Sequence, residues 1–189
     1  CIDAVKDVVT KCQFSVKRGI LGKNHEKVIS VFGSFDDIRL PNSSLDFCIS
    51  WESMHHSTNV SNTLVEAKRI VKNNGWIIIV DRAHNNNTPQ KEIDRMLNVV
   101  YPKEFLKENW LPLDKILTRK ENGEHEYRFK EWEKFFLKAR LKIEDSFIIR
   151  EKYKIKKTLN DNGIKEYFTD MTLGQFQKSK VIYLLKVEK

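Results

Sequence analysis

The sequence predicts a single α/β domain, and three observations support this prediction. Predicted strands and helices follow one another through residues 1–84 in the order strand, helix, strand, strand, helix, strand, joined by short connections. The segments at 45–50 and 76–80 are nearly continuous apolar runs, which are typical of parallel strands covered on both faces. A length of 189 residues is enough for one domain with a real core and too short for two.

Composition limits the class of protein. The 34 Lys and Arg residues against 26 Asp and Glu give a net charge of +8. Lysines are interleaved with glutamates, which favours a solvated surface over a nucleic-acid patch. The sequence has no apolar run of about 18 residues, and its first residues lack the features of a signal peptide. Three widely spaced cysteines indicate reduced thiols without a zinc site, so we expect a cytoplasmic location and no membrane span.

The first predicted elements are a strand that ends near residue 4, a helix, and a second strand over 28–32. Gly33 stops the second strand, and Gly19 occupies the position of a helix C-cap. The helix itself is predicted by apolar residues at helical spacing, which are Val5, Val8, Val9, Cys12 and Val16.

The strongest elements come next. The strand that begins at Leu45 is followed by a helix predicted from Asn59 or Ser61 to Asn74, with Gly75 as its C-cap. The β-branched run at 76–80 is the most strand-like segment of the chain.

Two segments, 85–128 and 151–179, interrupt the regular pattern and are predicted to be insertions that form a lid or a substrate-binding wall. Between and after them we predict a helix over 131–140 and strands over 141–150 and 181–187. The aromatic residues of this half are expected to form core beneath the insertions, with the alternative that one lines a substrate pocket. They are Trp110, Tyr127, Trp132, Tyr153, Tyr167 and Phe168.

Polar side chains follow the two strongest strands. Residues 50–56 (Ser-Trp-Glu-Ser-Met-His-His) follow the first, and residues 81–84 (Asp-Arg-Ala-His) follow the second. Ligands of open α/β sheets bind outside the carboxyl ends of the strands. These two strand ends therefore form the candidate site.

Three motifs in this order resemble the class I S-adenosylmethionine-dependent methyltransferases. They are GSFDDIRLPNSSLDFCIS at 33–50, the pair His55-His56, and EAKRIVKNNGW at 66–76. The closest group is that of small-molecule methyltransferases with a Gly-Asp-Ala-x-x-Leu-Pro loop before a Phe-Asp strand and a Lys-Pro-Gly-Gly turn. The resemblance covers about residues 1–84, and the closing strands fit the family's antiparallel end hairpin. It implies a doubly wound, Rossmann-like sheet of seven strands with the cofactor across the strand ends.

The resemblance also implies which residues bind S-adenosylmethionine and its product S-adenosylhomocysteine. These are Asp3, Ala4, Gly33, Ser34, Phe35, Ser50 and Trp51. Asp3 would accept hydrogen bonds from the two ribose hydroxyls, as suits a carboxylate. The family usually has Asp at position 34, and Ser34 would accept from the adenine amino group more weakly.

One part of the family pattern has no counterpart in this sequence. The first strand and its Gly-x-Gly loop, which cradles the amino-acid end of the cofactor, would lie before Cys1. We therefore expect these residues to be the later part of a longer protein, in which the first strand lies in the middle of the sheet.

The candidate catalytic residues are His55 and His56. Neighbouring residues of an extended segment point in opposite directions, so the two do not share a metal, and no metal is expected. One of them would face the methyl donor as a general base or orienting group, with packing under the next helix as the alternative. Glu52 is a second candidate base or a helix cap. Arg82 and His84 either contact the substrate or form a strand-end salt bridge or lid anchor.

The expected activity is methyl transfer to an oxygen or nitrogen atom of a small molecule. The sulfonium is already activated, so the protein needs mainly to align the acceptor and exclude water. One alternative is RNA methylation, which requires a basic face near residues 152–157. The other is a degenerate, non-catalytic fold that only binds, for which Ser34 and the missing glycine loop are the reasons.

Overall fold

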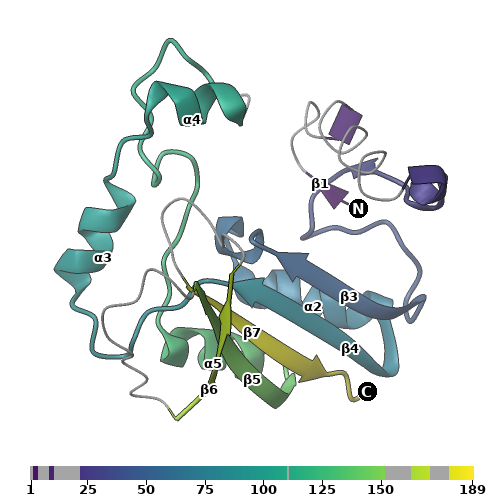
Figure 1. Ribbon diagram of the computed structural model, residues 1–189. Coiled ribbons are helices and arrows are strands. Elements are labelled where there is room, and N and C mark those ends of the chain that lie inside the picture. Colours follow the sequence, from purple (N-terminus) through teal and green to yellow (C-terminus); the bar gives the residue numbers. More distant parts are fainter. Residues whose placement is uncertain (1, 4–8, 11–21, 110, 152–162, 171–178) are drawn as a thin grey trace.

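The computed structural model describes residues 2–3, 9–10, 22–109, 111–151, 163–170 and 179–189 (Figure 1). Strands within these ranges form two sheets. The strands are β1 (Ile2–Asp3), β2 (Val31–Phe32), β3 (Leu45–Trp51), β4 (Val71–Asp81), β5 (Lys142–Glu151), β6 (Lys165–Thr169) and β7 (Ser179–Lys186). The α-helices are α2 (Val60–Ile70), α3 (Gln90–Leu97), α4 (Lys103–Glu108) and α5 (Phe129–Lys138), and the short 3-10 helices are η2 (Gly22–Lys27) and η3 (Met54–His56).

The larger sheet has the strand order β3-β4-β7-β5-β6, and β1 pairs with β2 in a separate two-stranded sheet. The pairs β1–β2, β3–β4 and β5–β6 are parallel, whereas β7 is antiparallel to both β4 and β5. The α/β fold and the antiparallel pairing of the closing strands are thus as predicted. The predicted helix over residues 5–18 lies almost entirely outside the described residues.

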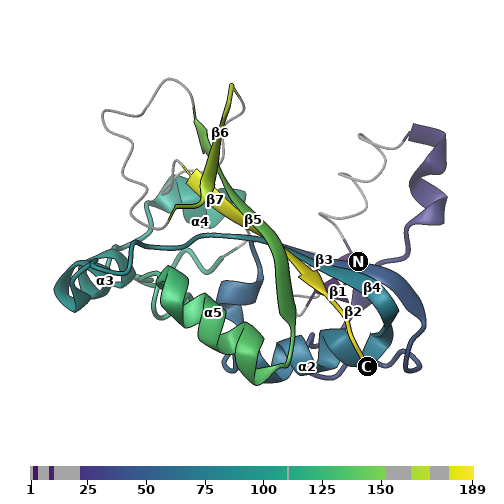
Figure 2. The same cartoon turned by 90° about the horizontal axis from the view of Figure 1, so that it is seen from below.

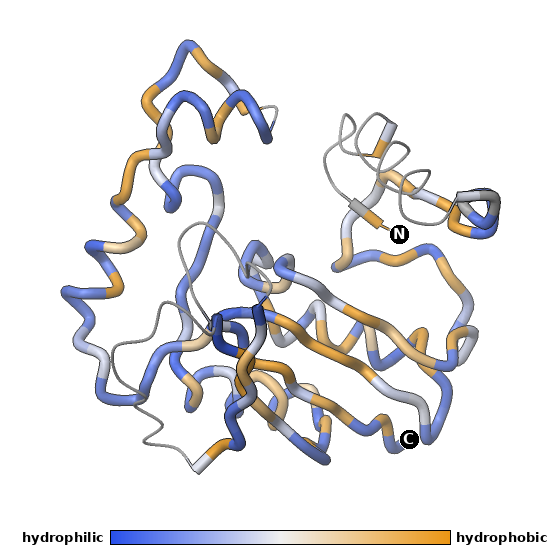
Figure 3. Tube along the Cα trace, viewed as in Figure 1, coloured by the Kyte–Doolittle hydropathy of each residue, from blue (hydrophilic) through white to orange (hydrophobic). Residues whose placement is uncertain are grey.

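Helices cover one face of the larger sheet. Figure 2 shows α2 and α5 side by side on the same side of the strands. The apolar stripe of α2, with Leu64 and Ile70 fully buried, packs there with Trp132 and Phe136 of α5. Figure 3 shows the apolar residues concentrated along the central strands.

The opposite face is uncovered at β3, so the prediction of a strand covered on both faces is wrong for the described part of the chain. Phe47, Ile49 and Trp51 point to one side by the pleat of the strand and are 58%, 53% and 63% exposed. Cys48 points to the other side and packs against the core. Within the described ranges, the outer edge of β3 also has no neighbouring strand.

The structure corrects three further predictions. Helix α2 ends at Ile70 rather than at Asn74, so Gly75 is not its cap but lies within β4. Strand β6 was not predicted; it pairs with β5 at the edge of the sheet. Its Tyr167 and Phe168 are about half exposed instead of forming core.

The first insertion contains α3 and α4, which lie on either side of the break at Pro102. Both helices project from the sheet on the side where β4 ends (Figure 1). None of the helices in the described ranges has the length and apolar character that crossing a membrane requires.

Gly75 is required by close approach of the chain. A Cβ at this position would lie 2.5 Å from Val71 Cγ1 and 2.6 Å from the carbonyl oxygen of Asp46. We expect Gly75→Ala to lower the free energy of unfolding by about 1–3 kcal/mol through overpacking, measured by urea denaturation. Gly33→Ala is the control, because its nearest contact would be 3.9 Å away, and it should change stability little. Equal stability of the two variants would contradict this explanation.

Candidate functional site

The carboxyl ends of β3 and β4 meet at one edge of the larger sheet. Trp51 is in register with Val80, and the backbone N–H of Glu52 donates to the Val80 carbonyl at 2.8 Å. Glu52 then takes a left-handed conformation with φ of 50°, which turns the chain into η3. Its carboxylate pairs with the buried ammonium of Lys180 at the start of β7.

The predicted cofactor residues stand at the ends of their strands. Ser50 is buried and shares a 2.9 Å hydrogen bond with Ser53, whereas Trp51 is exposed. Asp3 is in register with Phe32, so Gly33 and Ser34 leave β2 directly beside the end of β1. The Ser34 hydroxyl accepts from the backbone N–H of Asp36 at 3.1 Å.

Phe35 follows in the same loop and is half-buried. Ala4, by contrast, lies outside the described residues. The structure therefore places the described candidates at carboxyl ends of strands, but divides them between two sheets.

His55 is held in the interior by Asp81. Its Nδ1 lies 2.7 Å from Asp81 Oδ1, and the two side chains are 3% and 0% exposed. Asp81 also accepts from the backbone N–H groups of His55 and Arg82. This pair fixes η3 to the end of β4, which makes positioning the role that the geometry favours for His55.

His56 is the accessible member of the pair. Its ring is only partly buried and lies 4.4 Å from the ring of His55, centroid to centroid. Burial, together with the nearby His55 and Arg82, lowers the pKa of His56 to about 4. The imidazole is thus neutral at ordinary pH, suited to accept or donate a hydrogen bond more than to act as a strong base.

A buried ion cluster follows the end of β4. We use this name for Arg82, His84, Arg119, Glu124 and Glu126. Arg82 lies 2.8 Å from Glu124 and 3.3 Å from Glu126, and the Nε2 of His84 lies 2.7 Å from Glu126. Arg119 pairs with both glutamates. Of the alternatives for Arg82 and His84, this arrangement favours the anchor of the first insertion.

The pKa values of the two glutamates diverge. Burial alone would raise the pKa of Glu126, but His84, Arg82 and Arg119 together lower it to about 2. Burial raises the pKa of the Glu124 carboxyl despite the nearby Arg82. Of the two, Glu126 is therefore the carboxylate more strongly held as an anion, and it pairs with Arg82, Arg119 and His84.

Sequence reasoning missed three of the five members, Arg119, Glu124 and Glu126. A signal was present, because Glu124 and Glu126 alternate with His125 and Tyr127, as expected of an extended segment with two different faces. In the structure, the backbone N–H of His125 donates to the His55 carbonyl at 3.0 Å. This segment therefore touches both the ion cluster and η3.

The described residues contain no group of three or more His, Cys, Asp or Glu side chains that could hold a metal ion. The basic stretch at 152–157, on which RNA binding would depend, lies outside them.

Comparisons with known proteins place this fold. Residues 1–79 match the family model described as a methyltransferase domain. No curated protein matches the sequence.

Solved structures are similar over nearly the whole chain. A Bacillus halodurans protein assigned as a methyltransferase is 14% identical, with a TM-score of 0.61, and the match covers 100% of this chain and 82% of that one. The YcgJ protein of Bacillus subtilis is 17% identical, with a TM-score of 0.57, and the match covers 100% of this chain and 81% of that one. A SAM-dependent methyltransferase of Aquifex aeolicus is 17% identical, with a TM-score of 0.53, and the match covers 97% of this chain and 66% of that one.

The ion cluster makes a prediction about stability. Glu126→Gln removes the carboxylate that Arg82, Arg119 and His84 share and leaves Glu124 as the remaining carboxylate of the cluster. We expect it to lower the free energy of unfolding by about 3–5 kcal/mol. Glu121→Gln is the matched control, since Glu121 belongs to the same insertion, is exposed and contacts only Thr118. Thermal and urea unfolding would measure both, and a loss below about 1 kcal/mol for Glu126→Gln would argue against the cluster.

His56 makes a prediction about pH. Its pKa is about 4 in the folded protein and about 6.5 when unfolded, so the unfolded chain binds more protons in between. The contribution to stability is complete above pH 6.5 and is lost as the pH falls towards 4. Between pH 7 and 5 we expect a loss of about 2 kcal/mol.

The variant His56→Gln should lack this part of the pH dependence, as measured by urea unfolding at both pH values. Glu126 does not interfere, because its low pKa matters only below about pH 4.5. A pH dependence that is the same in both proteins would contradict the burial of His56.

Proposed function

We propose that this chain is a class I S-adenosylmethionine-dependent methyltransferase that methylates an oxygen or nitrogen atom of a small molecule. The match of residues 1–79 to the methyltransferase-domain model and the similar fold support this proposal. The observation that carries the proposal is the end of β3. There an exposed aromatic side chain, Trp51, is followed by a tight polar turn that leads to η3 and the partly buried ring of His56. An exposed indole at a strand end suits a ligand that has both an apolar and a polar part.

We infer that the cofactor binds on the side of β1 to β3. Asp3, Gly33, Ser34 and Phe35 would hold its nucleoside part, and Ser50 with Trp51 would line the methionine part. When bound, S-adenosylmethionine supplies an activated methyl group on a sulfonium. The protein's task is then to align the acceptor atom and to exclude water.

His56 is the residue that we assign to the acceptor. Its neutral ring can orient a hydroxyl or amine by a hydrogen bond, while His55 and Asp81 fix the segment that carries it. Glu52 is less suited to the part of base, because Lys180 already pairs with its carboxylate. Arg82 acts through the ion cluster rather than on the substrate, and His84 is paired with Glu126 of that cluster.

The expectation of a further strand with a glycine loop stays a prediction. It is supported by the division of the strands into two sheets and by the open edge of β3. If the 189 residues alone bind S-adenosylhomocysteine with micromolar affinity, a further strand is not needed and the expectation is wrong.

We also propose a cytoplasmic location, for which the unpaired thiol of Cys48 is the supporting observation.

Isothermal titration of the full natural chain with S-adenosylhomocysteine tests the cofactor. We expect binding, and we expect Trp51→Ala to weaken it by roughly tenfold, as the loss of one aromatic contact would. Phe47→Ala is the matched control, since Phe47 is equally exposed on the same face of β3 but lies four residues from the strand end. No heat at high protein concentration would overturn the proposed activity, and equal effects of both variants would remove Trp51 from the site.

A further inference from the structure

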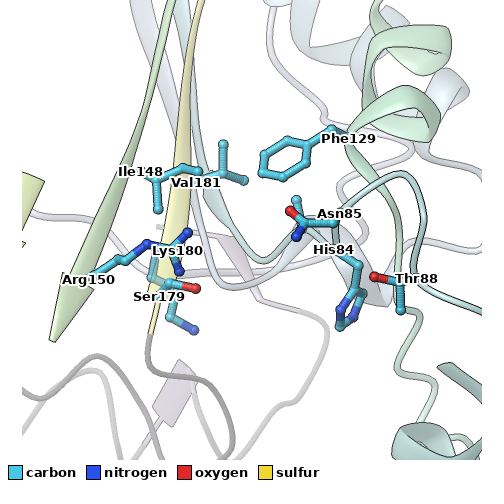
Figure 4. A pocket seen from close by; sticks show the side chains of 10 residues that line it. His84, Asn85, Thr88, Phe129, Ile148, Arg150, Ser179, Lys180 and Val181 are labelled. Atoms are coloured by element: carbon cyan, nitrogen blue, oxygen red, sulfur yellow. The ribbon is translucent and has the colours of Figure 1, made fainter. Parts of the chain in front are cut away.

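A cavity of about 290 Å³ lies at the same edge of the sheet as the end of β3. One wall is formed by the end of β5 and the start of β7, and the other by the loop after β4 and the first residue of α5. Figure 4 shows these two walls facing each other, with Arg150 and Lys180 on one and His84 and Thr88 on the other.

The polar lining is cationic or neutral and contains no carboxylate. Its members are His84, Asn85, Thr88, Arg150, Ser179 and Lys180. The carboxylates that pair with the three basic residues, Glu126, Glu52 and Glu166, are not part of the lining. The cavity therefore offers positive charge and hydroxyl or amide groups to whatever enters it.

Arg150 retains hydrogen-bonding capacity for a ligand. Its Nη2 donates to Glu166 at 2.8 Å, but its Nε is buried and has no hydrogen-bond partner among the described residues. A buried cationic donor without an acceptor is unfavourable, and an anionic oxygen is the acceptor that best satisfies a guanidinium. Lys180 on the same wall is nearly inaccessible, with its side chain 5% exposed.

The cavity also has an apolar end. Figure 4 places Ile148, Val181 and Phe129 together at one end and the basic side chains at the other. A volume of this size suits a small molecule rather than a chain segment.

We propose that this cavity binds the anionic group, carboxylate or phosphate, of a small molecule. Arg150 would donate from Nε to the anion. Lys180 would contribute charge, and His84, Ser179 and Thr88 would contribute polar contacts. The apolar end would receive the adjoining carbon atoms.

The position of the cavity indicates which molecule carries the anionic group. Strands β3, β4, β7 and β5 follow one another in the sheet, and neighbouring strands are about 4.8 Å apart. The wall of the cavity that carries Lys180 and Arg150 therefore lies about 10–14 Å from β3. Glu52 and Lys180 link the two places directly. Resting on the methyltransferase function proposed above, we assign the anion to the methyl acceptor, which would carry its acidic group about this far from the methylated atom.

The binding of an anion can be tested without the cofactor. In an NMR titration of the ¹⁵N-labelled protein, succinate and inorganic phosphate should each give saturable shifts of the amides of Asn85, Thr88, Ser179 and Val181. Succinamide, which has the same carbon chain without the charge, should give none. The anion that binds more tightly identifies the substrate group as carboxylate or phosphate, and either supports the proposal.

Two variants sharpen this test. Arg150→Gln should weaken the tighter-binding anion by roughly tenfold or more. Lys142→Gln is the matched control, because it removes one positive charge from the exposed far end of the same strand. It should leave the affinity within about twofold, as expected for a distant, screened charge.

Shifts that do not saturate, that scatter over surface lysines, or that are unchanged in Arg150→Gln would overturn the proposal. The wild-type titration alone locates the anion, so the test stands even where Arg150→Gln fails to fold. Anion binding in a protein that does not bind S-adenosylhomocysteine would retain the cavity and reject the methyltransferase function, so the two failures are distinguishable.

Discussion

The requirement to compensate buried charges at the end of β4 organises the rest of this structure. Asp81 is fully buried and Arg82 nearly so, and each is stable there only with partners of opposite charge or with hydrogen bonds. His55 supplies the partner for Asp81, and Glu124 and Glu126 supply those for Arg82. Because these partners come from η3 and from the first insertion, the same interactions that satisfy β4 also fix both segments beside the site.

The end of β4 is also bonded to the hydrophobic core. The indole N–H of Trp132 in α5 donates to the Arg82 carbonyl at 2.9 Å, and Trp132 itself is fully buried between Phe136 and Tyr183. The end of β4 is therefore bonded both to the helix layer, through Trp132, and to the first insertion, through the ion cluster. The uncovered face of β3 has no such ties, and its aromatic side chains remain accessible.

Sequence alone predicted what depends on local pattern. The β-branched run at 76–80 and the apolar spacing of α2 each specify an element regardless of context, and both are present. Gly75 was misassigned because its reason is the approach of Val71 and Asp46, which only the fold brings near. The ion cluster joins Arg82 to Glu126 across 44 residues, and adjacent His55 and His56 differ only in what packs against them. Such properties depend on tertiary contacts, and the alternation of Glu124 and Glu126 with His125 and Tyr127 indicates an extended segment but not its partners.

The candidate cofactor residues and the basic cavity lie at the ends of different strands, and this separation bears on the chemistry. Candidates for the cofactor lie at the ends of β1, β2 and β3. The basic cavity lies between the loop after β4 and the wall formed by β5 and β7. His56 follows β3 and is held against β4 through its neighbour, so it lies between the two groups. Transfer of an activated methyl group needs alignment more than acid–base power. In the proposed function, a neutral histidine between the two proposed binding sites would meet that need without a strong base, which agrees with the low pKa of His56.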